Sequence, residues 1–193
     1  LSVNQAGGFI RSNPNKLSPN LQMYFAAITY SSAPEGKRPL MQPDPYPGFL
    51  NSVGQLRPAS RGHLEISSTE PTTQPKIYPN YYSAEEDVVE MLEGVRILRA
   101  LAETPALSNI IEHEMTPGLN IHSDDELIDD IKQRSSTVFH PTSTCMMGSN
   151  THDSVVDSQG RVHGVRQLRI VDASIFPTVI SGNTNAPSIM IGE

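Results

Sequence analysis

The strongest pattern in the chain is an apolar face that repeats with the period of an α-helix. It follows Ser83-Ala84-Glu85-Glu86, in which a serine stands three residues before a glutamate, the capping box that begins many helices. Pro105 ends the pattern because proline interrupts helical hydrogen bonding. The sequence therefore predicts a long amphipathic helix in this region. Its apolar positions are Val88, Met91, Leu92, Val95, Leu98 and Leu101.

A second capping box, Ser123-Asp124-Asp125-Glu126, predicts a shorter helix that runs to about Arg134. Its acidic start and its basic end, at Lys132 and Arg134, complement the helix dipole. A further helix is expected near the C-terminus, with Pro187 at its first position. The apolar positions of the second helix are Leu127, Ile128 and Ile131.

Extended chain is expected wherever aromatic and β-branched residues, or alternating polar and apolar residues, lie between turn formers. Strands and helices segregate along the chain and no internal repeat occurs, which favours an α+β fold over residues 1 to about 150. The expected extended segments are residues 21–30, 62–67, part of 71–79, 155–164 around a turn, and 168–171 as a strand that ends at Asp172-Ala173.

A proline-rich stretch, residues 31–54, is expected to form a loop. A loop of that length often borders a binding site, and the alternative is a plain excursion over the surface. Tyr46 and Phe49 lie in this stretch and are candidates for the border of a substrate pocket.

Composition and charge exclude several classes of protein. The 193 residues carry 14 Lys and Arg against 21 Asp and Glu, a formal net charge of −7, which disfavours a nucleic-acid backbone binder. No apolar run approaches the roughly 18–20 residues of a membrane helix. The length suits one domain, or one domain with a piece of another.

The ends of the chain and its single cysteine indicate its origin. The N-terminus has no starting Met and no signal-peptide pattern, and the chain stops in mid-pattern at Ile191-Gly192-Glu193, so we expect a fragment of a longer protein. Cys145 is the one cysteine and no N-glycosylation sequon occurs. Both features suit a reducing, cytoplasmic location.

Common catalytic motifs are missing from the sequence. It contains no G-x-G-x-x-G, no Walker-type phosphate loop and no G-x-S-x-G nucleophile elbow. His113-Glu114 has no second histidine at metalloprotease spacing, so we expect no metal site. Cys145 is interpreted as a small apolar residue, with a role as nucleophile beside His140 as the alternative.

Five segments of the chain carry motifs that can be compared with known families. In sequence order they are Ala6–Ile10, Pro58–Gly62, Pro79–Ser83, Val138–Gly148 and Val155–Glu193. The fourth contains His140-Pro141 followed by small hydroxyl residues, a setting that can hold a neutral imidazole as a base. Together the five segments resemble the glucose–methanol–choline (GMC) family of FAD-dependent oxidoreductases over essentially the whole chain.

The resemblance implies the C-terminal half of such an enzyme, choline dehydrogenase-like or alcohol dehydrogenase-like. It implies an α+β substrate-binding domain over residues 1–150, a mostly antiparallel sheet with helices on one side. Residues 151–193 are then a strand–helix segment that returns to the FAD-binding domain. The N-terminal Rossmann-like half, which carries the main FAD fingerprint, is not in this sequence and would be the partner of this chain.

The resemblance also assigns roles to residues. His140 matches the catalytic histidine, which would take the hydroxyl proton of a small primary alcohol as hydride passes to the flavin, giving an aldehyde. Asn183 matches its partner, which is His or Asn in the family. Ser143 stands where many members have Gly. Cofactor contacts are implied for Asp172 and Ala173 at the phosphate–ribose portion, and for Asn183, Thr184, Asn185 and Pro187 at the isoalloxazine.

Alternatives remain at this point. Without the resemblance, Asp172 is interpreted as a turn cap and Asn185 as a helix cap. A few relatives of this fold are hydroxynitrile lyases, which keep the flavin but cleave cyanohydrins. The chain by itself is expected to be a folded module that binds FAD weakly or not at all.

Overall fold

The computed structural model describes residues 4–30 and 43–193, so the part of the predicted loop at 31–42 lies outside the described residues. Two compact units divide the chain. The first holds Leu1–Gln55 and Glu90–Ile128, and the second holds Leu56–Val89 and Asp129–Glu193. The predicted domains 1–150 and 151–193 concern the larger enzyme, and that division stays a prediction.

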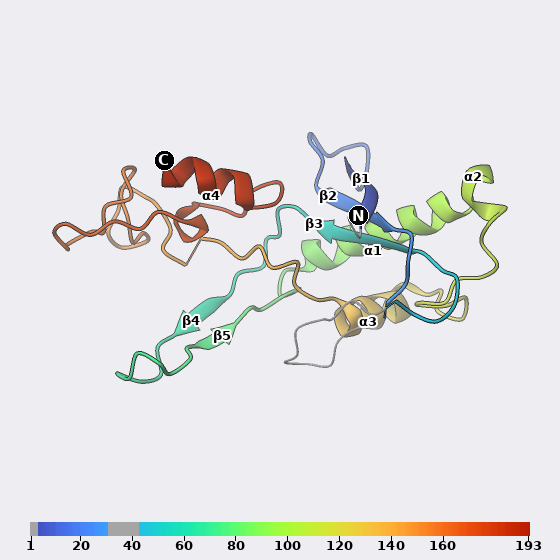
Figure 1. Cartoon of the computed structure of the whole chain (residues 1–193), viewed down its shortest axis with the longest axis horizontal. Coiled ribbons are helices and arrows are strands. Elements are labelled where there is room, and N and C mark those ends of the chain that lie inside the picture. Colours follow the sequence, from blue (N-terminus) through green and yellow to red (C-terminus); the bar gives the residue numbers. More distant parts are fainter. Residues whose placement is uncertain (1–3, 31–42) are drawn as a thin grey trace. The chain divides into compact units, whose positions relative to one another are not determined.

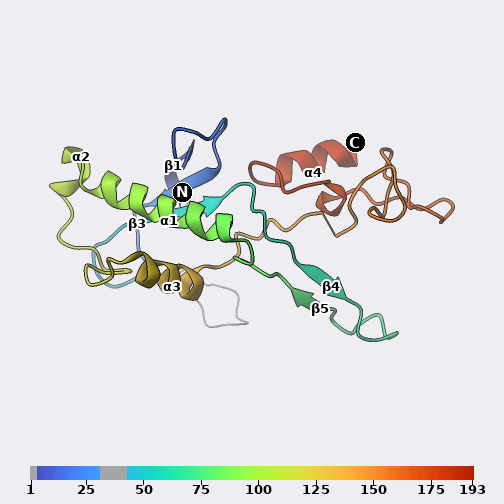
Figure 2. The ribbon, with the colours of Figure 1, turned by 180° about the vertical axis from the view of Figure 1, so that it is seen from behind.

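The first unit is built on a three-stranded antiparallel sheet. Its strands, in the order β1-β2-β3, are Asn4–Ile10, Leu21–Ala26 and Leu50–Gln55. Helix α1, Glu85–Ala102, covers one face of the sheet with its segment from Glu90 onward, as Figures 1 and 2 show from opposite sides.

Close packing between α1 and the sheet depends on Gly94. A Cβ atom at this position would lie 3.1 Å from a Val53 methyl carbon of β3 and 3.2 Å from a Leu21 methyl carbon of β2. Leu21 is fully buried, and Met91 and Leu92 of the helix are almost completely buried. The missing side chain therefore allows the helix backbone to approach the sheet and to close the core.

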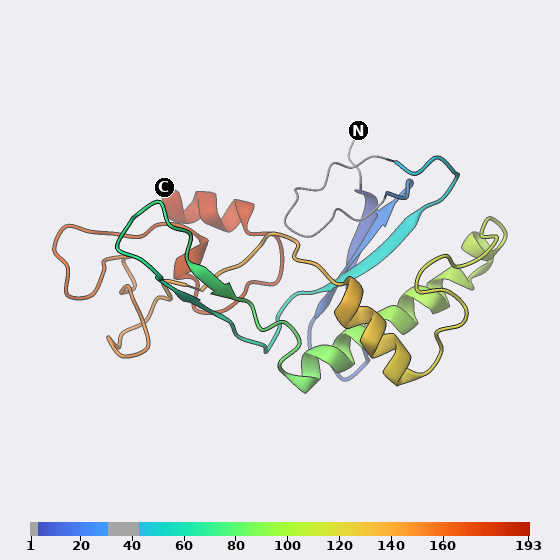
Figure 3. The same cartoon turned by 90° about the horizontal axis from the view of Figure 1, so that it is seen from below.

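Two further helices follow α1 in the chain. Helix α2, Pro105–Ser108, begins at the proline that ends α1, and α3 runs over Asp124–Arg134 (Figure 3). The capping box of α3 is formed as predicted. The Ser123 backbone N–H donates to Glu126 Oε2 at 3.0 Å, and the Glu126 N–H donates to Ser123 Oγ at 3.3 Å. The Ser123 N–H, the Ser123 hydroxyl and the His122 N–H all donate to the Glu126 carboxylate, and these bonds lower its pKa.

The second unit holds a two-stranded ribbon and an irregular C-terminal part. Strands β4, His63–Glu65, and β5, Lys76–Tyr78, pair antiparallel, and the rings of their residues His63 and Tyr78 stack at 4.6 Å. A 3₁₀ turn over Ala173–Ile175 and helix α4, Asn185–Gly192, follow later in the chain. The combination of antiparallel sheets and separate helices is the α+β arrangement that the sequence predicts.

Two predictions about where strands lie were wrong, one a missed strand and the other a strand that does not form. Residues 50–54, predicted as loop, lie in β3, because pairing with β2 over the register from Ala26–Leu50 to Leu21–Gln55 stabilises a segment of low β-propensity. Residues 168–171, predicted as a strand, form only an isolated bridge between Arg161 and Arg169. No second neighbour pairs with them among the described residues, and Leu168 remains 48% exposed.

Two helix starts also differ from the predictions. The Ser83 and Glu86 side chains do not form the predicted capping box. Instead the Ala84 N–H donates to Ser60 Oγ at 3.0 Å, and α1 begins at Glu85. Helix α4 begins at Asn185, which places Pro187 at its third position and not its first. Proline is tolerated there because the N–H groups of the first turn have no intrahelical acceptor.

Asp87 anchors the segment before β4 to the first turn of α1. It is only 2% exposed, and its two carboxylate oxygens accept the backbone N–H groups of Ala59 and Ser60 at 2.8 Å each. Residues 59 and 60 belong to the Pro58–Gly62 block of the sequence. One buried carboxylate thus fixes the path of that block.

A tight turn around Asp157 carries a pH-dependent contribution to stability. Desolvation raises the pKa of Asp157, but the Gln159 N–H and the Arg161 side chain and N–H donate to its carboxylate and lower the pKa to about 2. Because the folded pKa lies below the ordinary value near 3.8, this contribution is complete above pH 4 and is lost as the pH falls towards 2.

We therefore expect Asp157→Asn to remove part of the acid sensitivity of the protein between pH 4 and 2. Thermal unfolding measured against pH in the two proteins tests this. The curves should converge at low pH and separate above pH 4, with the parent the more stable. Curves that stay parallel over the whole range would show that Asp157 has the same pKa in the folded and unfolded chains.

No helix in the described ranges combines the length and the apolar character needed to cross a membrane.

Candidate active site

His140 and Asn183, 43 residues apart in sequence, are in direct contact in the second unit. Asn183 Nδ2 lies 2.7 Å from His140 Nε2. On the other side of the ring, His140 Nδ1 lies 2.8 Å from Thr184 Oγ1 and 3.5 Å from the Thr184 backbone N–H nitrogen. His140 is half-buried and Asn183 is exposed, so solvent reaches the pair.

Backbone pairing of two distant segments brings these residues together. The chain after His140 runs beside the 3₁₀ turn, with Ser143 N–H donating to Ala173 O at 3.2 Å and Cys145 N–H donating to Ser174 O at 3.0 Å. A third bond joins Met147 N–H to Ile175 O at 2.9 Å. Since the 3₁₀ turn leads towards Asn183, the ladder fixes His140 against the start of α4.

Two residues close to His140 have left-handed backbone conformations. Phe139 has φ +62° and Ser143 has φ +67°, a region that residues with a Cβ atom enter at a cost of about 1–2 kcal/mol. The two bends turn the chain sharply around His140. The angle at Ser143 also explains why glycine suits this position, where the sequence resemblance places Gly in many family members.

The backbone angle at Ser143 gives a testable difference between two variants. Both Ser143→Gly and Ser143→Ala lose the contact between the Thr142 and Ser143 hydroxyls, which are 2.9 Å apart. Only glycine relieves the left-handed strain, so the Gly variant should be more stable than the Ala variant by about 1 kcal/mol. Thermal unfolding of both proteins measures this difference, and equal melting temperatures would mean that the angle costs nothing.

The 3₁₀ turn uses Asp172 as its cap. Asp172 Oδ1 accepts the Ser174 N–H at 2.8 Å, and hydrogen bonding to Ser174 lowers the pKa of this carboxyl. The turn-cap interpretation of Asp172 is thus observed in the structure. Asn185 is the first residue of α4, and Thr184 holds the capping position instead.

The first N–H groups of α4 are open to a ligand. Thr184 makes no side-chain capping bond, and the N–H groups of Asn185 and Ala186 have no acceptor among the described residues. Such groups, at the positive end of the helix dipole, favour an electronegative ligand. Because they follow Thr184, whose hydroxyl contacts the His140 ring, a ligand bound there would also lie near that imidazole.

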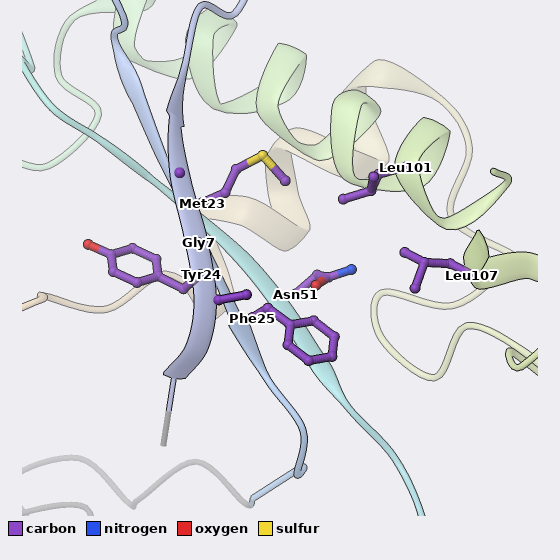
Figure 4. Close-up of a pocket in the computed structure, with 9 residues that line it drawn as sticks. Gly7, Met23, Tyr24, Phe25, Asn51, Leu101 and Leu107 are labelled. Carbon is purple, nitrogen blue, oxygen red and sulfur yellow. The ribbon is translucent and has the colours of Figure 1, made fainter. Parts of the chain in front are cut away.

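A separate cavity of about 300 Å³ lies in the first unit, between the sheet and the helices α1 and α2. Figure 4 shows Met23, Leu101 and Leu107 directed towards it. Its walls are mostly apolar, with Tyr24 and Asn51 among the lining residues, and contain no acid, histidine or cysteine. Neither Tyr46 nor Phe49 lines it, and the Phe49 ring packs against Phe25 at 5.4 Å, so their place at a substrate pocket stays a prediction.

Sequence reasoning missed two features. Asp87 lies four residues before Met91, on the buried face of α1, and a charged residue on an apolar face is a signal that could have identified it. Thr184 was expected at the cofactor, and the contact of its hydroxyl with His140 was not expected. Local sequence holds no signal for that contact because it joins residues 44 positions apart.

Comparison with known proteins shows the family of this chain. The family model described as GMC oxidoreductase matches residues 58–192, and the chain belongs to this family. Among curated relatives, an alcohol dehydrogenase [acceptor] of Pseudomonas putida is 40% identical over 192 residues, covering 100% of this chain and 34% of the relative. An oxygen-dependent choline dehydrogenase of Yersinia pseudotuberculosis is 42% identical over 191 residues, covering 98% of this chain and 32% of the relative.

Two solved structures are similar to this chain over most of its length. Pyridoxine 4-oxidase from Mesorbium loti has a TM-score of 0.83 at 25% identity, covering 98% of this chain and 36% of that one. A formate oxidase of Aspergillus oryzae has a TM-score of 0.79 at 26% identity, covering 92% and 30%. The chain therefore spans about one third of the length of the relatives it matches.

Proposed function

We propose that this chain is the substrate-binding and catalytic C-terminal part of an FAD-dependent enzyme that oxidises a small primary alcohol to an aldehyde. The observation that carries the proposal is the contact of 2.7 Å between His140 and Asn183 at the start of α4. This contact places a base beside an amide at a position that solvent reaches. The names of the curated relatives, alcohol dehydrogenase and choline dehydrogenase, support alcohols as the substrate class.

The two side chains suit the removal of a hydroxyl proton. When the hydroxyl of an alcohol takes the place of the Asn183 amide at Nε2, the neutral imidazole of His140 can accept its proton. The Asn183 amide beside it can donate a hydrogen bond to the oxygen as negative charge develops there. Proton removal makes the hydrogen on the α-carbon easier to transfer, so this pair prepares the alcohol for oxidation.

The residues around His140 and Asn183 suit the electronegative edge of a flavin ring. FAD, when bound, would supply the acceptor for the two electrons and the hydrogen of the α-carbon. The N–H groups at the start of α4 would hold and stabilise its isoalloxazine ring, with Asn183, Thr184, Asn185 and Pro187 around it. Asp172 and Ala173 are proposed to contact the phosphate–ribose portion, and the preceding part of the longer protein to bind most of the cofactor.

An assay with full-length, FAD-loaded protein and an artificial electron acceptor tests the proposal. Without oxygen, repeated turnover of primary alcohols, choline among them, to aldehydes should occur only when the acceptor is present. A mandelonitrile-type cyanohydrin should not be cleaved. Release of cyanide from the cyanohydrin without consumption of the acceptor would instead assign a lyase.

The 193-residue chain alone should bind FAD weakly or not at all, because it contains no G-x-G-x-x-G phosphate-binding motif. Flavin fluorescence during titration with the purified chain measures this. Little quenching is expected, and the longer protein is the positive control. A purified chain that remains yellow after gel filtration would contradict the expectation.

A further inference from the structure

The hydrogen bonds of His140 define which of its two nitrogens is basic. Both ring nitrogens have polar neighbours, Asn183 Nδ2 at 2.7 Å from Nε2 and Thr184 Oγ1 at 2.8 Å from Nδ1. A neutral imidazole carries one N–H, and an amide nitrogen can only donate. Nε2 therefore accepts from Asn183, which leaves the ring proton on Nδ1, where the Thr184 hydroxyl oxygen accepts it.

The position of Thr184 supports this arrangement. Threonine at a helix N-cap commonly uses its hydroxyl to accept an N–H of the first turn. Thr184 occupies the N-cap of α4 without such a bond, and its hydroxyl faces the imidazole instead. The backbone N–H of Thr184, at 3.5 Å from Nδ1, is at the outer limit of a hydrogen bond and competes weakly.

The backbone of Thr184 is itself held in place. The Ser188 N–H donates to the Thr184 carbonyl at 3.0 Å, and Ser188 Oγ donates to the same carbonyl at 2.7 Å. Two bonds from the next turn of α4 thus fix the residue whose hydroxyl contacts His140. A rigid acceptor restricts both the tilt of the ring and the location of its proton.

We infer that Thr184 is a positioning residue for His140: by accepting the Nδ1–H proton it keeps Nε2 unprotonated and directed towards the substrate. The inference rests on the proposed function for the role of Nε2, while the tautomer itself can be observed without turnover. The hydrogen bond made by one ring nitrogen decides the protonation of the other. Without it, the Asn183 amide can turn to present its oxygen to Nε2, and the ring can carry its proton there, where it cannot act as a base.

Nitrogen NMR of full-length, FAD-loaded protein labelled with ¹⁵N-histidine tests the inference, at a pH where the imidazole is neutral. The His140 signals are identified by their absence from the spectrum of His140→Gln. In the parent, Nδ1 should resonate as a protonated nitrogen and Nε2 as an unprotonated one. Thr184→Val, which keeps the shape of the side chain, should shift the population towards Nε2–H, and Thr184→Ser should restore the parent pattern.

Two further measurements separate positioning from general damage. Ser188→Ala removes the bond from Ser188 Oγ to the Thr184 carbonyl but keeps the backbone bond from the Ser188 N–H and the Thr184 hydroxyl itself, so it should leave the tautomer unchanged. With an alcohol substrate, Thr184→Val should lower kcat about 10- to 100-fold with KM little changed, and Thr184→Ser should recover most of kcat.

The outcomes distinguish the inference from the proposed function. A parent spectrum with the proton on Nε2, or a Thr184→Val spectrum identical to the parent, would overturn the role of Thr184 even if alcohols are oxidised. The expected spectra in a protein that oxidises no alcohol would support the role of Thr184 as the residue that sets the tautomer and would reject alcohol oxidation.

Discussion

Replacing His140 by Ala in the full-length, FAD-loaded enzyme should slow the reduction of the flavin by an alcohol about 10²- to 10⁴-fold. The imidazole contacts the amide of Asn183, and its loss leaves water to accept the hydroxyl proton. Asn183→Ala should have a smaller effect, of about 10²-fold, because it removes one hydrogen-bond donor and leaves the base. Rapid mixing under anaerobic conditions measures both rates.

A second histidine provides the matched control. His152 is exposed, and among the described residues its imidazole has no hydrogen bond. In the His152→Ala variant the alcohol should therefore reduce the flavin at the parental rate. Melting temperatures of the three variants show whether the fold survives. If the flavin of His140→Ala is reduced by the alcohol as fast as that of the parent, His140 does not act as the base.

Asp87→Ala should destabilise the protein by about 3 kcal/mol. The substitution leaves the N–H groups of Ala59 and Ser60 without their acceptor, and an unsatisfied buried N–H costs about 1–3 kcal/mol. Asp87→Asn keeps one acceptor oxygen and should lose less. Chemical or thermal denaturation of the variants, measured under the same conditions as the parent, gives the difference.

Glu86→Ala is the control for Asp87→Ala. It removes an equal charge from the same first turn of α1, but Glu86 is exposed and accepts no buried N–H from the part of the chain that the structure describes. Loss of a favourable interaction with the helix dipole limits the expected effect to less than about 1 kcal/mol. If the two variants lose the same stability, the charge matters and the buried hydrogen bonds do not.

The helices were the most predictable part of the fold because their signals are local. The apolar face of α1 and the capping box of α3 lie within a few turns of sequence, and the structure confirms both. Strand β1 gave no such signal, since Gly7 and Gly8 interrupt it and most of its residues are exposed. Its structure comes from pairing with β2, which local sequence does not show.

The site was predictable only through family resemblance. His140 and Asn183 were named as a pair from their motifs, and the structure brings them within 2.7 Å. Their contact depends on backbone bonds between residues 143–147 and 173–175, a pairing that no pattern in either segment indicates. The same reason explains why the second contact of the ring, with Thr184, could not be predicted from sequence.

Anaerobic mixing of the full-length, FAD-loaded protein with a panel of primary alcohols, choline included, tests the central claim most directly. The account predicts loss of the oxidised-flavin absorbance with at least one alcohol, together with one aldehyde formed for each flavin reduced. Flavin that stays oxidised with every alcohol, while a cyanohydrin is cleaved by the same preparation, would contradict the claim.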